Sequence, residues 1–217
     1  MSGEPLVIVP LPSRCRYSPR MEAPPLVLAS TSRYRRELLA RLGLPFSARA
    51  PACDEDAIKR GLDLAPLELA AYLARAKAES LCAELPSGVI IGSDQIAEID
   101  GVILGKPGTA DRAAEQLALL AGRTHRLITA VAVAHPGGAI VSEHVDVARL
   151  TMRPLVSAQI ARYVAADAPL DCAGSYKLEA RGITLFSRIE SEDSSAITGL
   201  PLIALTTMLS SLGFAVP

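Results

Sequence analysis

Short apolar runs that end in polar clusters constrain the fold of this chain most. Leu26–Ala29 is followed by Ser30-Thr31-Ser32, and residues 89–91 are followed by a glycine and then by Ser93-Asp94-Gln95. Apolar runs of this length, bounded by turn signals, are typical of buried strands. In open α/β sheets, ligand crevices form at the ends of strands. The sequence therefore predicts a sheet with polar side chains gathered at its strand ends.

Helices are expected between and after these strands. The first follows the Ser32 hydroxyl as its N-cap, covers residues 33–42 and stops at Gly43. Further helices are expected at about 67–85, at 110–120, at 157–165 and from Pro201 to just before Gly213, and further strands at 46–50, 127–134, 139–150 and 183–189. Residues 54–56 and 171–177 are expected in polar loops. Because strands and helices mix without strict alternation, the predicted class is α/β or α+β around a mixed sheet.

The N-terminal segment differs from the rest of the chain. Residues 1–25 hold six of the sixteen prolines. Proline lacks the backbone donor that helices and central strands need. We therefore expect a flexible tail over residues 1–25 and a single domain over residues 26–217. Met21 lies just before the first strand, which makes it a candidate for the true start of the protein.

Composition excludes several classes of protein. Half of the residues are hydrophobic and 21% are charged, which excludes general disorder. Lys and Arg number 22 against 23 Asp and Glu without a basic block, so we expect no nucleic-acid partner. The absence of an 18-residue apolar run argues against a membrane partner. The four cysteines are widely spaced and the three histidines lack zinc spacing, which indicates reduced thiols in a cytoplasmic protein.

Charged side chains recur at the predicted strand ends and loops. Ser30 and Arg35 flank a helix N-terminus, where backbone N–H groups and the helix dipole favour phosphate. A carboxylate after an apolar strand, as at Asp94, either orients a loop or binds a metal ion and activates water. Taken alone, each signal is more often a helix cap or a solvated charge. Together the residues offer acids for a metal ion and cations for a triphosphate; the further members are Glu55, Lys77, Lys106, Lys177 and Glu179.

Five short motifs occur in the order in which one enzyme family carries them. They are residues 28–35 (LASTSRYR), Gly92-Ser93-Asp94-Gln95, Gly105-Lys106-Pro107, residues 171–179 (DCAGSYKLE) and Gly199-Leu200-Pro201. Through them the chain resembles the Maf (septum formation inhibitor-like) nucleotide pyrophosphatases over about residues 26–212. The resemblance implies a Maf/ITPase-like α/β fold, in which helices flank a central mixed sheet and a cleft separates two lobes. It also implies hydrolysis of nucleoside triphosphates to the monophosphate and pyrophosphate with a divalent cation, Mg2+ or Mn2+.

The resemblance also implies roles for individual residues. Asp94 matches the family's catalytic acid, the proton acceptor, and Glu55 with Asp94 forms the expected metal pair. Phosphate and substrate binding is expected from Ser30, Arg35, Lys77 and Lys106, to which we add Lys177. One position departs from the family pattern: many members carry proline where this chain has Arg33.

Three positions indicate the branch of the family. Members that resemble thymidine and uridine triphosphate pyrophosphatases carry arginine, threonine and glutamine at the positions of Tyr34, Gln95 and Glu179. Members that resemble 7-methyl-GTP pyrophosphatases carry an aromatic residue, glutamine and glutamate, as this chain does. Methylation at N7 gives guanine a positive charge, which an aromatic ring and a carboxylate both favour.

The expected activity is therefore hydrolysis of 7-methyl-GTP or a related modified nucleotide. Two alternatives stay open: a dTTP/UTP pyrophosphatase, and a nucleotide-binding regulator of cell division that never turns its ligand over. The nucleoside triphosphate is the expected partner, and a homodimer is left open.

Overall fold

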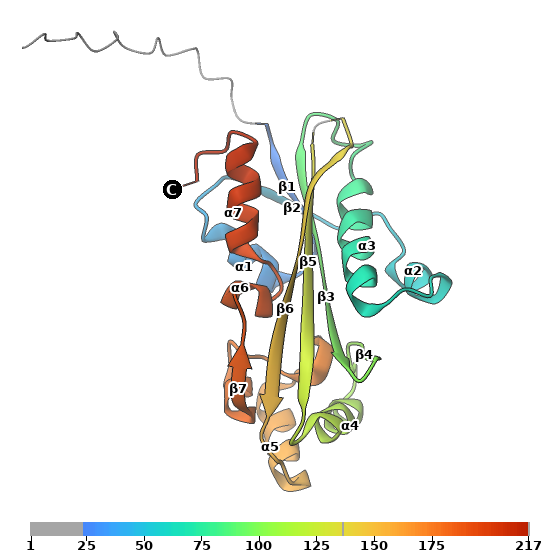
Figure 1. The fold of residues 1–217 in the computed structure, drawn as a ribbon, viewed down its shortest axis with the longest axis vertical. Coiled ribbons are helices and arrows are strands. Elements are labelled where there is room, and N and C mark those ends of the chain that lie inside the picture. Colours follow the sequence, from blue (N-terminus) through green and yellow to red (C-terminus); the bar gives the residue numbers. More distant parts are fainter. Residues whose placement is uncertain (1–23, 136, 217) are drawn as a thin grey trace, which may run out of the picture.

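A seven-stranded mixed sheet forms the centre of the molecule (Figure 1). The computed structural model describes residues 24–135 and 137–216, so nearly all of the expected tail lies outside the described residues. The strand order is β2-β1-β3-β5-β6-β7, with the short β4 paired to β3. The strands are β1 (Leu26–Ala29), β2 (Ser47–Arg49), β3 (Val89–Ile99), β4 (Val102–Leu104), β5 (Thr124–Ala134), β6 (Ile140–Met152) and β7 (Phe186–Glu190). The expected α/β class with a central mixed sheet is confirmed.

One edge of β3 is partly uncovered. On this side, β1 pairs in parallel with residues Val89 to Ile91 of β3, and β4 pairs antiparallel with Ala97 to Ile99. Between these two pairings, the described part of the chain supplies no neighbouring strand. On the other side, β5 pairs antiparallel along most of β3. Both faces of the sheet can therefore be reached at the middle of β3.

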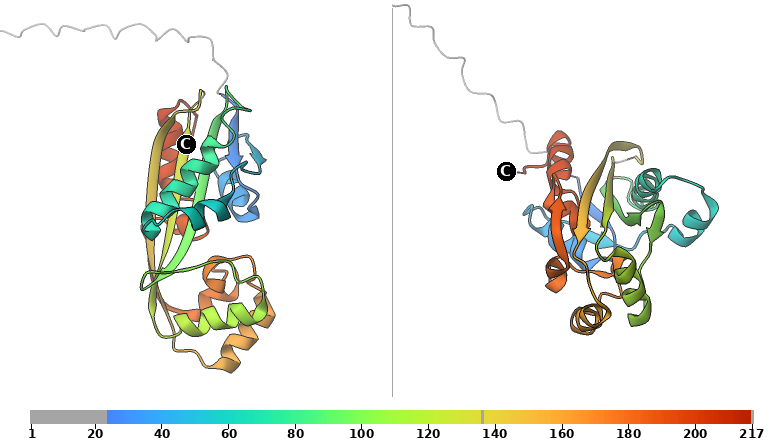
Figure 2. Two further views of the ribbon diagram at one scale, coloured as in Figure 1. Left: turned by 90° about the vertical axis from the view of Figure 1, so that its right-hand side faces the viewer. Right: turned by 60° about the horizontal axis from the view of Figure 1, so that its bottom comes forward.

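Helices cover both faces of the sheet and one end of it. They are α1 (Arg33–Ala40), α2 (Glu55–Gly61), α3 (Pro66–Glu79), α4 (Ala110–Leu120), α5 (Ser157–Asp167), α6 (Ser194–Ile197) and α7 (Leu202–Ser211), with 3-10 turns η1 (Ala173–Ser175) and η2 (Arg181–Leu185). Figure 1 shows α1, α6 and α7 on one face and α3 on the other. Figure 2 shows α4 and α5 set apart at the far end of the long strands, so that the molecule has two parts joined by β3, β5 and β6. No helix in the described ranges combines the length and apolar character needed to span a membrane.

Each part of the molecule has its own buried apolar cluster. Leu39 of α1 and Leu205 of α7 pack with Leu28 of β1 on one face of the sheet. At the far end, Leu117 of α4 and Ile160 of α5 belong to a separate cluster. Burial of such side chains contributes roughly 1.5–3 kcal/mol each.

Gly92 sets how closely α3 approaches β3. A Cβ atom at this position would lie 2.1 Å from the Ala74 carbonyl oxygen and 2.6 Å from the Ala78 nitrogen, both in the α3 backbone. Backbone cannot move aside as a flexible side chain can, so only glycine fits here. The close packing brings Lys77, which lies between these two residues on α3, onto β3 beside Asp94.

Several predicted boundaries were wrong, and local contacts explain the differences. The strand expected at 89–91 continues to Ile99, because its residues stay almost entirely buried between β5 and the covering helices. Residues 54–56, expected in a loop, begin α2, because Asp54 Oδ1 accepts a hydrogen bond from the Ala57 N–H at 2.9 Å. The helix expected at 67–85 ends at Glu79. The strand expected at 183–189 begins only at Phe186, after η2.

Candidate active site

A cavity of about 1050 Å³ opens beside the uncovered edge of β3. Its walls come from the β1–α1 turn, α2, α3, β3, the segment after β4, the segment around η1 and the α6–α7 turn. It is thus lined from both parts of the molecule, as expected for a cleft between two lobes. Nine of the ten predicted site residues line it: Ser30, Tyr34, Arg35, Glu55, Lys77, Asp94, Gln95, Lys106 and Glu179.

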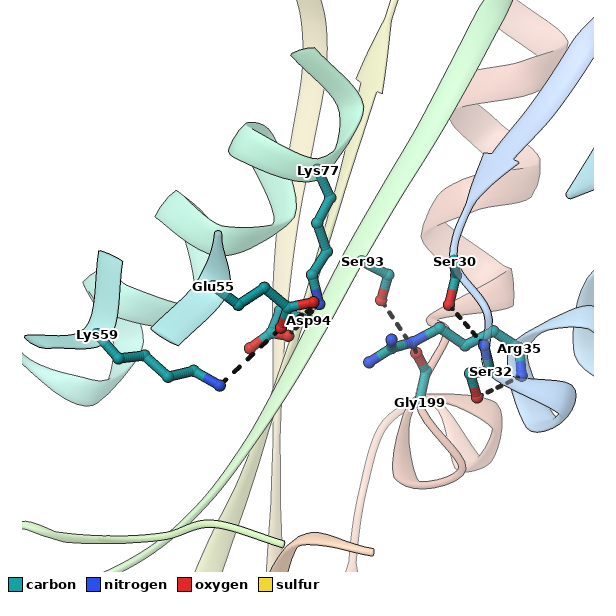
Figure 3. Close-up of polar contacts among 9 residues, drawn as sticks. All are labelled: Ser30, Ser32, Arg35, Glu55, Lys59, Lys77, Ser93, Asp94 and Gly199. Atoms are coloured by element: carbon teal, nitrogen blue, oxygen red, sulfur yellow. Dashed lines mark hydrogen bonds and ion pairs between the residues drawn. The ribbon is translucent and has the colours of Figure 1, made fainter. Parts of the chain in front are cut away.

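Lys77, Glu55 and Asp94 form an ionic centre on the face of β3 that α3 covers (Figure 3). Lys77 Nζ lies 2.7 Å from Asp94 Oδ1 and 2.9 Å from Glu55 Oε2. Lys77 and Asp94 are only 4% and 5% exposed. Buried charges are costly unless they are paired and hydrogen-bonded, and here one ammonium pairs with two carboxylates. The cost of leaving any member without its partner makes this centre sensitive to substitution.

One oxygen of this centre has no protein partner. Asp94 Oδ2 is buried and accepts no hydrogen bond from the residues that the structure describes. A buried acceptor without a donor costs roughly 1–3 kcal/mol, and more when it is charged. Because Oδ1 is held by Lys77, Oδ2 is the atom at which this carboxylate can receive a proton, a water molecule or a cation.

The opposite side of β3 carries a second set of contacts (Figure 3). The carbonyl oxygen of Gly199 accepts hydrogen bonds from Arg35 Nε at 2.9 Å and from Ser93 Oγ at 3.0 Å. Gly199 has a φ of +115°, which side chains other than glycine rarely adopt. Burial lowers the pKa of Arg35, and the charges of Asp94 and Glu55 oppose that shift. An arginine stays charged under these conditions, so a fixed guanidinium faces the cavity near the carboxylates.

The β1–α1 turn is fixed by its own hydroxyl groups. Ser30 Oγ accepts a hydrogen bond from the Ser32 N–H at 3.1 Å, and Ser32 Oγ accepts one from the Arg35 N–H at 3.4 Å. Ser32 is thus the N-cap of α1, as the sequence predicts. The turn presents the positive end of α1 to the cavity, where an anion is favoured.

The three expected specificity residues reach the cavity from different elements. Tyr34 lies on α1, Gln95 on β3 and Glu179 beyond η1. The Tyr34 hydroxyl accepts a hydrogen bond from Arg33 Nη2 at 2.8 Å, and the Arg33 guanidinium carbon lies 4.6 Å from the Tyr34 ring centroid. Burial raises the pKa of Tyr34, which stays a neutral phenol. Arg33, the departure from the family pattern, therefore shapes the surroundings of Tyr34.

The sequence model of the Maf-like protein family matches residues 25–212. This chain belongs to that family. It is 46% identical over 194 residues to the 7-methyl-GTP pyrophosphatase of Xanthomonas campestris pv. campestris, a match covering 89% of this chain and 99% of the relative. It is 49% identical over 186 residues to the 7-methyl-GTP pyrophosphatase of Bdellovibrio bacteriovorus, covering 86% and 96%. Among solved structures, the Staphylococcus aureus Ham1 protein aligns at a TM-score of 0.45 and 13% identity, covering 86% of this chain and 98% of that one.

The carboxylates of this Maf-like chain fit a divalent cation that is shared with substrate. Among residues 24–135 and 137–216, no group of three or more His, Cys, Asp or Glu side chains is arranged to hold a metal ion. Mg2+ is usually bound by one or two carboxylates, with water and substrate phosphates as the other ligands. Glu55 and Asp94 supply two carboxylates, and Asp94 Oδ2 is a buried oxygen that accepts no hydrogen bond from the described residues. The donor set therefore fits a cation that arrives with the phosphates.

The two remaining lysines differ in their surroundings. Lys106 is exposed and lines the cavity just after β4. Lys177, in contrast, does not line it. Its Nζ donates hydrogen bonds to the carbonyl oxygens of Asp167 and Ala168, each at 3.1 Å, and lies 3.4 Å from Asp171 Oδ1. Lys177 stabilises the C-terminal end of α5, and among the predicted site residues its charge acts on Tyr34.

Sequence reasoning missed three residues at or behind the cavity wall. Lys59 lies one turn after Glu55 on α2, with Nζ 4.0 Å from Glu55 Oε2. Had residues 54–56 been assigned to a helix, this i,i+4 spacing would have indicated the pair. Ser93 adjoins Asp94 in the polar triplet and binds Gly199. Thr129 lies within an apolar strand and carries no local signal.

Proposed function

We propose that this protein is a nucleoside triphosphate pyrophosphatase that hydrolyses 7-methyl-GTP, or a related modified nucleotide, to the monophosphate and pyrophosphate. The observation that carries the proposal is one cavity lined both by the Lys77–Glu55–Asp94 centre and by Tyr34 and Glu179. The names of relatives at 46% and 49% identity support the same activity and substrate.

In the proposed reaction, a water molecule attacks the α-phosphorus of the nucleotide. The bond from this phosphorus to the bridging oxygen breaks, and pyrophosphate leaves. Asp94 Oδ2, the carboxylate oxygen that Lys77 leaves unpaired, either accepts the proton of the attacking water or binds the divalent cation. Glu55 and Asp94 would hold the divalent cation, which supplies positive charge against the phosphates when bound.

Three cations of the chain complement the charge of the triphosphate. Lys77 and Arg35 are held in fixed positions by protein contacts, whereas Lys106 is exposed at the cavity wall. Fixed cations need no reorganisation as negative charge shifts toward the leaving pyrophosphate, so they stabilise the transition state more than solvent does. None of them distinguishes one base from another.

The base is recognised by the other group of residues. We propose that the Tyr34 ring stacks on the methylated purine, since a cationic base gains roughly 1–2 kcal/mol from the face of an aromatic ring. The Glu179 carboxylate accepts hydrogen bonds from the N–H edge of guanine, a charge-assisted contact that a positively charged base strengthens.

We further propose that the enzyme acts in the cytoplasm. The three cysteines in the described ranges, Cys53, Cys82 and Cys172, are free thiols. Thiols of this kind are typical of a reducing compartment.

A pyrophosphate-release assay tests the proposal. Purified protein is incubated with 7-methyl-GTP, GTP, TTP and UTP, each with Mg2+, with Mn2+ and with EDTA. The expected result is metal-dependent release that is fastest with 7-methyl-GTP. Preference for TTP or UTP would instead support the pyrimidine nucleotide alternative. Calorimetric binding of 7-methyl-GTP without any pyrophosphate release would support the regulator alternative.

A further inference from the structure

Thr129 lies directly behind Gln95 in the sheet. Gln95 of β3 is in register with Thr129 of β5, so their side chains project on the same face. Thr129 is 1% exposed, whereas Gln95 is half-buried and lines the cavity. The helix α6 packs over this face and places two backbone carbonyl groups beside the pair.

The Gln95 amide nitrogen is fully engaged by these neighbours. Nε2 lies 2.9 Å from Thr129 Oγ1 and 3.0 Å from the carbonyl oxygens of both Ala196 and Ile197. The Thr129 hydroxyl donates its only hydrogen to the Ala196 carbonyl at 2.9 Å. Thr129 Oγ1 is therefore an acceptor toward Gln95.

This network permits only one orientation of the amide. If the Gln95 side chain were flipped, its carbonyl oxygen would face the carbonyl oxygens of Ala196 and Ile197 with no hydrogen between them. Amide orientation is assigned from such partners, and here two obligate acceptors decide it. The nitrogen points to α6 and Thr129, and Oε1 is the polar atom that Gln95 can offer to a ligand.

We propose that Thr129 is a positioning residue that, together with the Ala196 and Ile197 carbonyl groups, holds Gln95 with its carbonyl oxygen toward the base, so that the pocket selects bases presenting N–H donors. The inference rests on the proposed function and specifies how the same site reads its substrate. Gln95 and Glu179 both line the cavity, and Oε1 of the first and the carboxylate of the second are hydrogen-bond acceptors. A base that directs donors at both is bound, and a base that directs an acceptor at either is rejected.

The hydrogen-bond donors of each base predict an order of substrate preference. Guanine and 7-methylguanine carry donors at N1 and at the 2-amino group. Hypoxanthine keeps the N1 donor but lacks the 2-amino group, and adenine presents an acceptor at N1. We therefore expect GTP to be hydrolysed more efficiently than ITP, and ITP more efficiently than ATP. A site whose polar groups lose their partners rejects the wrong substrate strongly.

Two substitutions at one position test the role of the hydroxyl. Thr129→Val keeps the shape of the side chain and removes the hydroxyl, whereas Thr129→Ser keeps the hydroxyl. kcat and KM are measured for 7-methyl-GTP, GTP, ITP and ATP. For Thr129→Val we expect kcat/KM to fall about 5- to 30-fold for the guanine nucleotides, mainly through KM, and to stay level for ATP. Thr129→Ser should keep most of the wild-type preference.

A matched control comes from the same strand. Thr124 of β5 also forms a hydroxyl hydrogen bond across the sheet, at 2.9 Å, but its partner is Thr151, which does not line the cavity. Thr124→Val should leave the order of preference unchanged. Equal losses on all four nucleotides in Thr129→Val, or an equal loss in Thr129→Ser, would overturn the positioning role.

A spectroscopic measurement separates this inference from the proposed function. The side-chain NH2 signals of Gln95, assigned by their absence in Gln95→Leu, should exchange slowly with solvent in the wild type and faster in Thr129→Val. This readout requires no turnover. Fast exchange in the wild type would overturn the inference even if 7-methyl-GTP is the substrate. Slow exchange in a protein that hydrolyses no guanine nucleotide would leave the fixed amide standing and refute the proposed function.

Discussion

Asp94 and Gln95 are consecutive residues of β3, yet they work on opposite faces of the sheet. Asp94 meets Lys77 of α3 at 2.7 Å, within a centre of formal charges that leaves one carboxylate oxygen without a partner. Gln95 is neutral, and its amide nitrogen donates hydrogen bonds to Thr129 and to backbone carbonyl groups of α6. The first surroundings suit proton transfer and phosphate chemistry, and the second suit recognition of a neutral hydrogen-bonding pattern.

The uncovered edge of β3 explains how one cavity can use both faces. Side chains alternate along a strand, so a one-residue step moves from the α3 face to the α6 face. Because β1 and β4 pair with different stretches of β3, no described strand separates the two faces at residues 92–96. Catalysis and base recognition can therefore be changed separately by substitution, and the following experiments test that separation.

The largest effect is expected on the α3 face. Asp94→Asn keeps the size of the side chain but removes the charge that, in the proposed mechanism, accepts a proton or binds the cation. We expect kcat to fall by about 100-fold or more, to the same extent for every nucleotide, because this group contacts no base. Lys77 keeps Glu55 as a partner, so the circular dichroism spectrum should match the wild type.

A matched carboxylate controls for this substitution. Asp171 also lines the cavity but is exposed and pairs with Lys177. Asp171→Asn should retain most of the activity. Near wild-type turnover by Asp94→Asn would refute the proposed mechanism, and a loss that depends on the base would refute the separation of the two faces.

A smaller, base-dependent effect is expected from the recognition residues. In the variant Tyr34→Arg, Gln95→Thr, Glu179→Gln, the stacking ring and the acidic acceptor are lost, and the new arginine repels a cationic base. We expect kcat/KM for 7-methyl-GTP to fall and that for TTP or UTP to rise. Each lost polar contact is worth about 1–3 kcal/mol, or about 5- to 150-fold. Measurements on 7-methyl-GTP, GTP, TTP and UTP decide the matter, since equal losses on all four would indicate a structural role.

The sequence predicted the membership of the cavity better than its geometry. Polar clusters after apolar runs, together with the motif order of the Maf-like family, identified nine residues that the fold brings to one cavity. The separation of Asp94 from Gln95 was not predictable, because the strand was expected to stop before them. Only the continuation of β3 to Ile99 makes alternation apply to these two residues.

Two other positions show why local patterns are insufficient. Thr129 belongs to a continuous apolar run, and its role depends on the register with Gln95, a residue 34 positions away. Lys177 lies in a motif loop where a charged side chain has no periodicity. Its partners are the carbonyl groups of the last residue of α5 and of its C-cap, which no spacing within the motif indicates.

The smallest effects are expected for Lys106 and Lys177, and they test which cations contact the phosphates. Lys106→Met removes a cation from the cavity wall. We expect KM to rise about 5- to 10-fold for every nucleotide alike, with kcat little changed, because the proposed contact of Lys106 is with phosphates that all nucleotides share.

Lys177→Met should leave kcat and KM near their wild-type values. It should lower the free energy of unfolding by about 1 kcal/mol, because the carbonyl groups of Asp167 and Ala168 lose their shared donor. Steady-state kinetics and urea denaturation of both variants provide the measurements. If Lys177→Met raised KM uniformly while its stability was unchanged, Lys177 would belong with the phosphate-binding cations after all, and the turn after α5 would have to open toward the cavity when substrate binds.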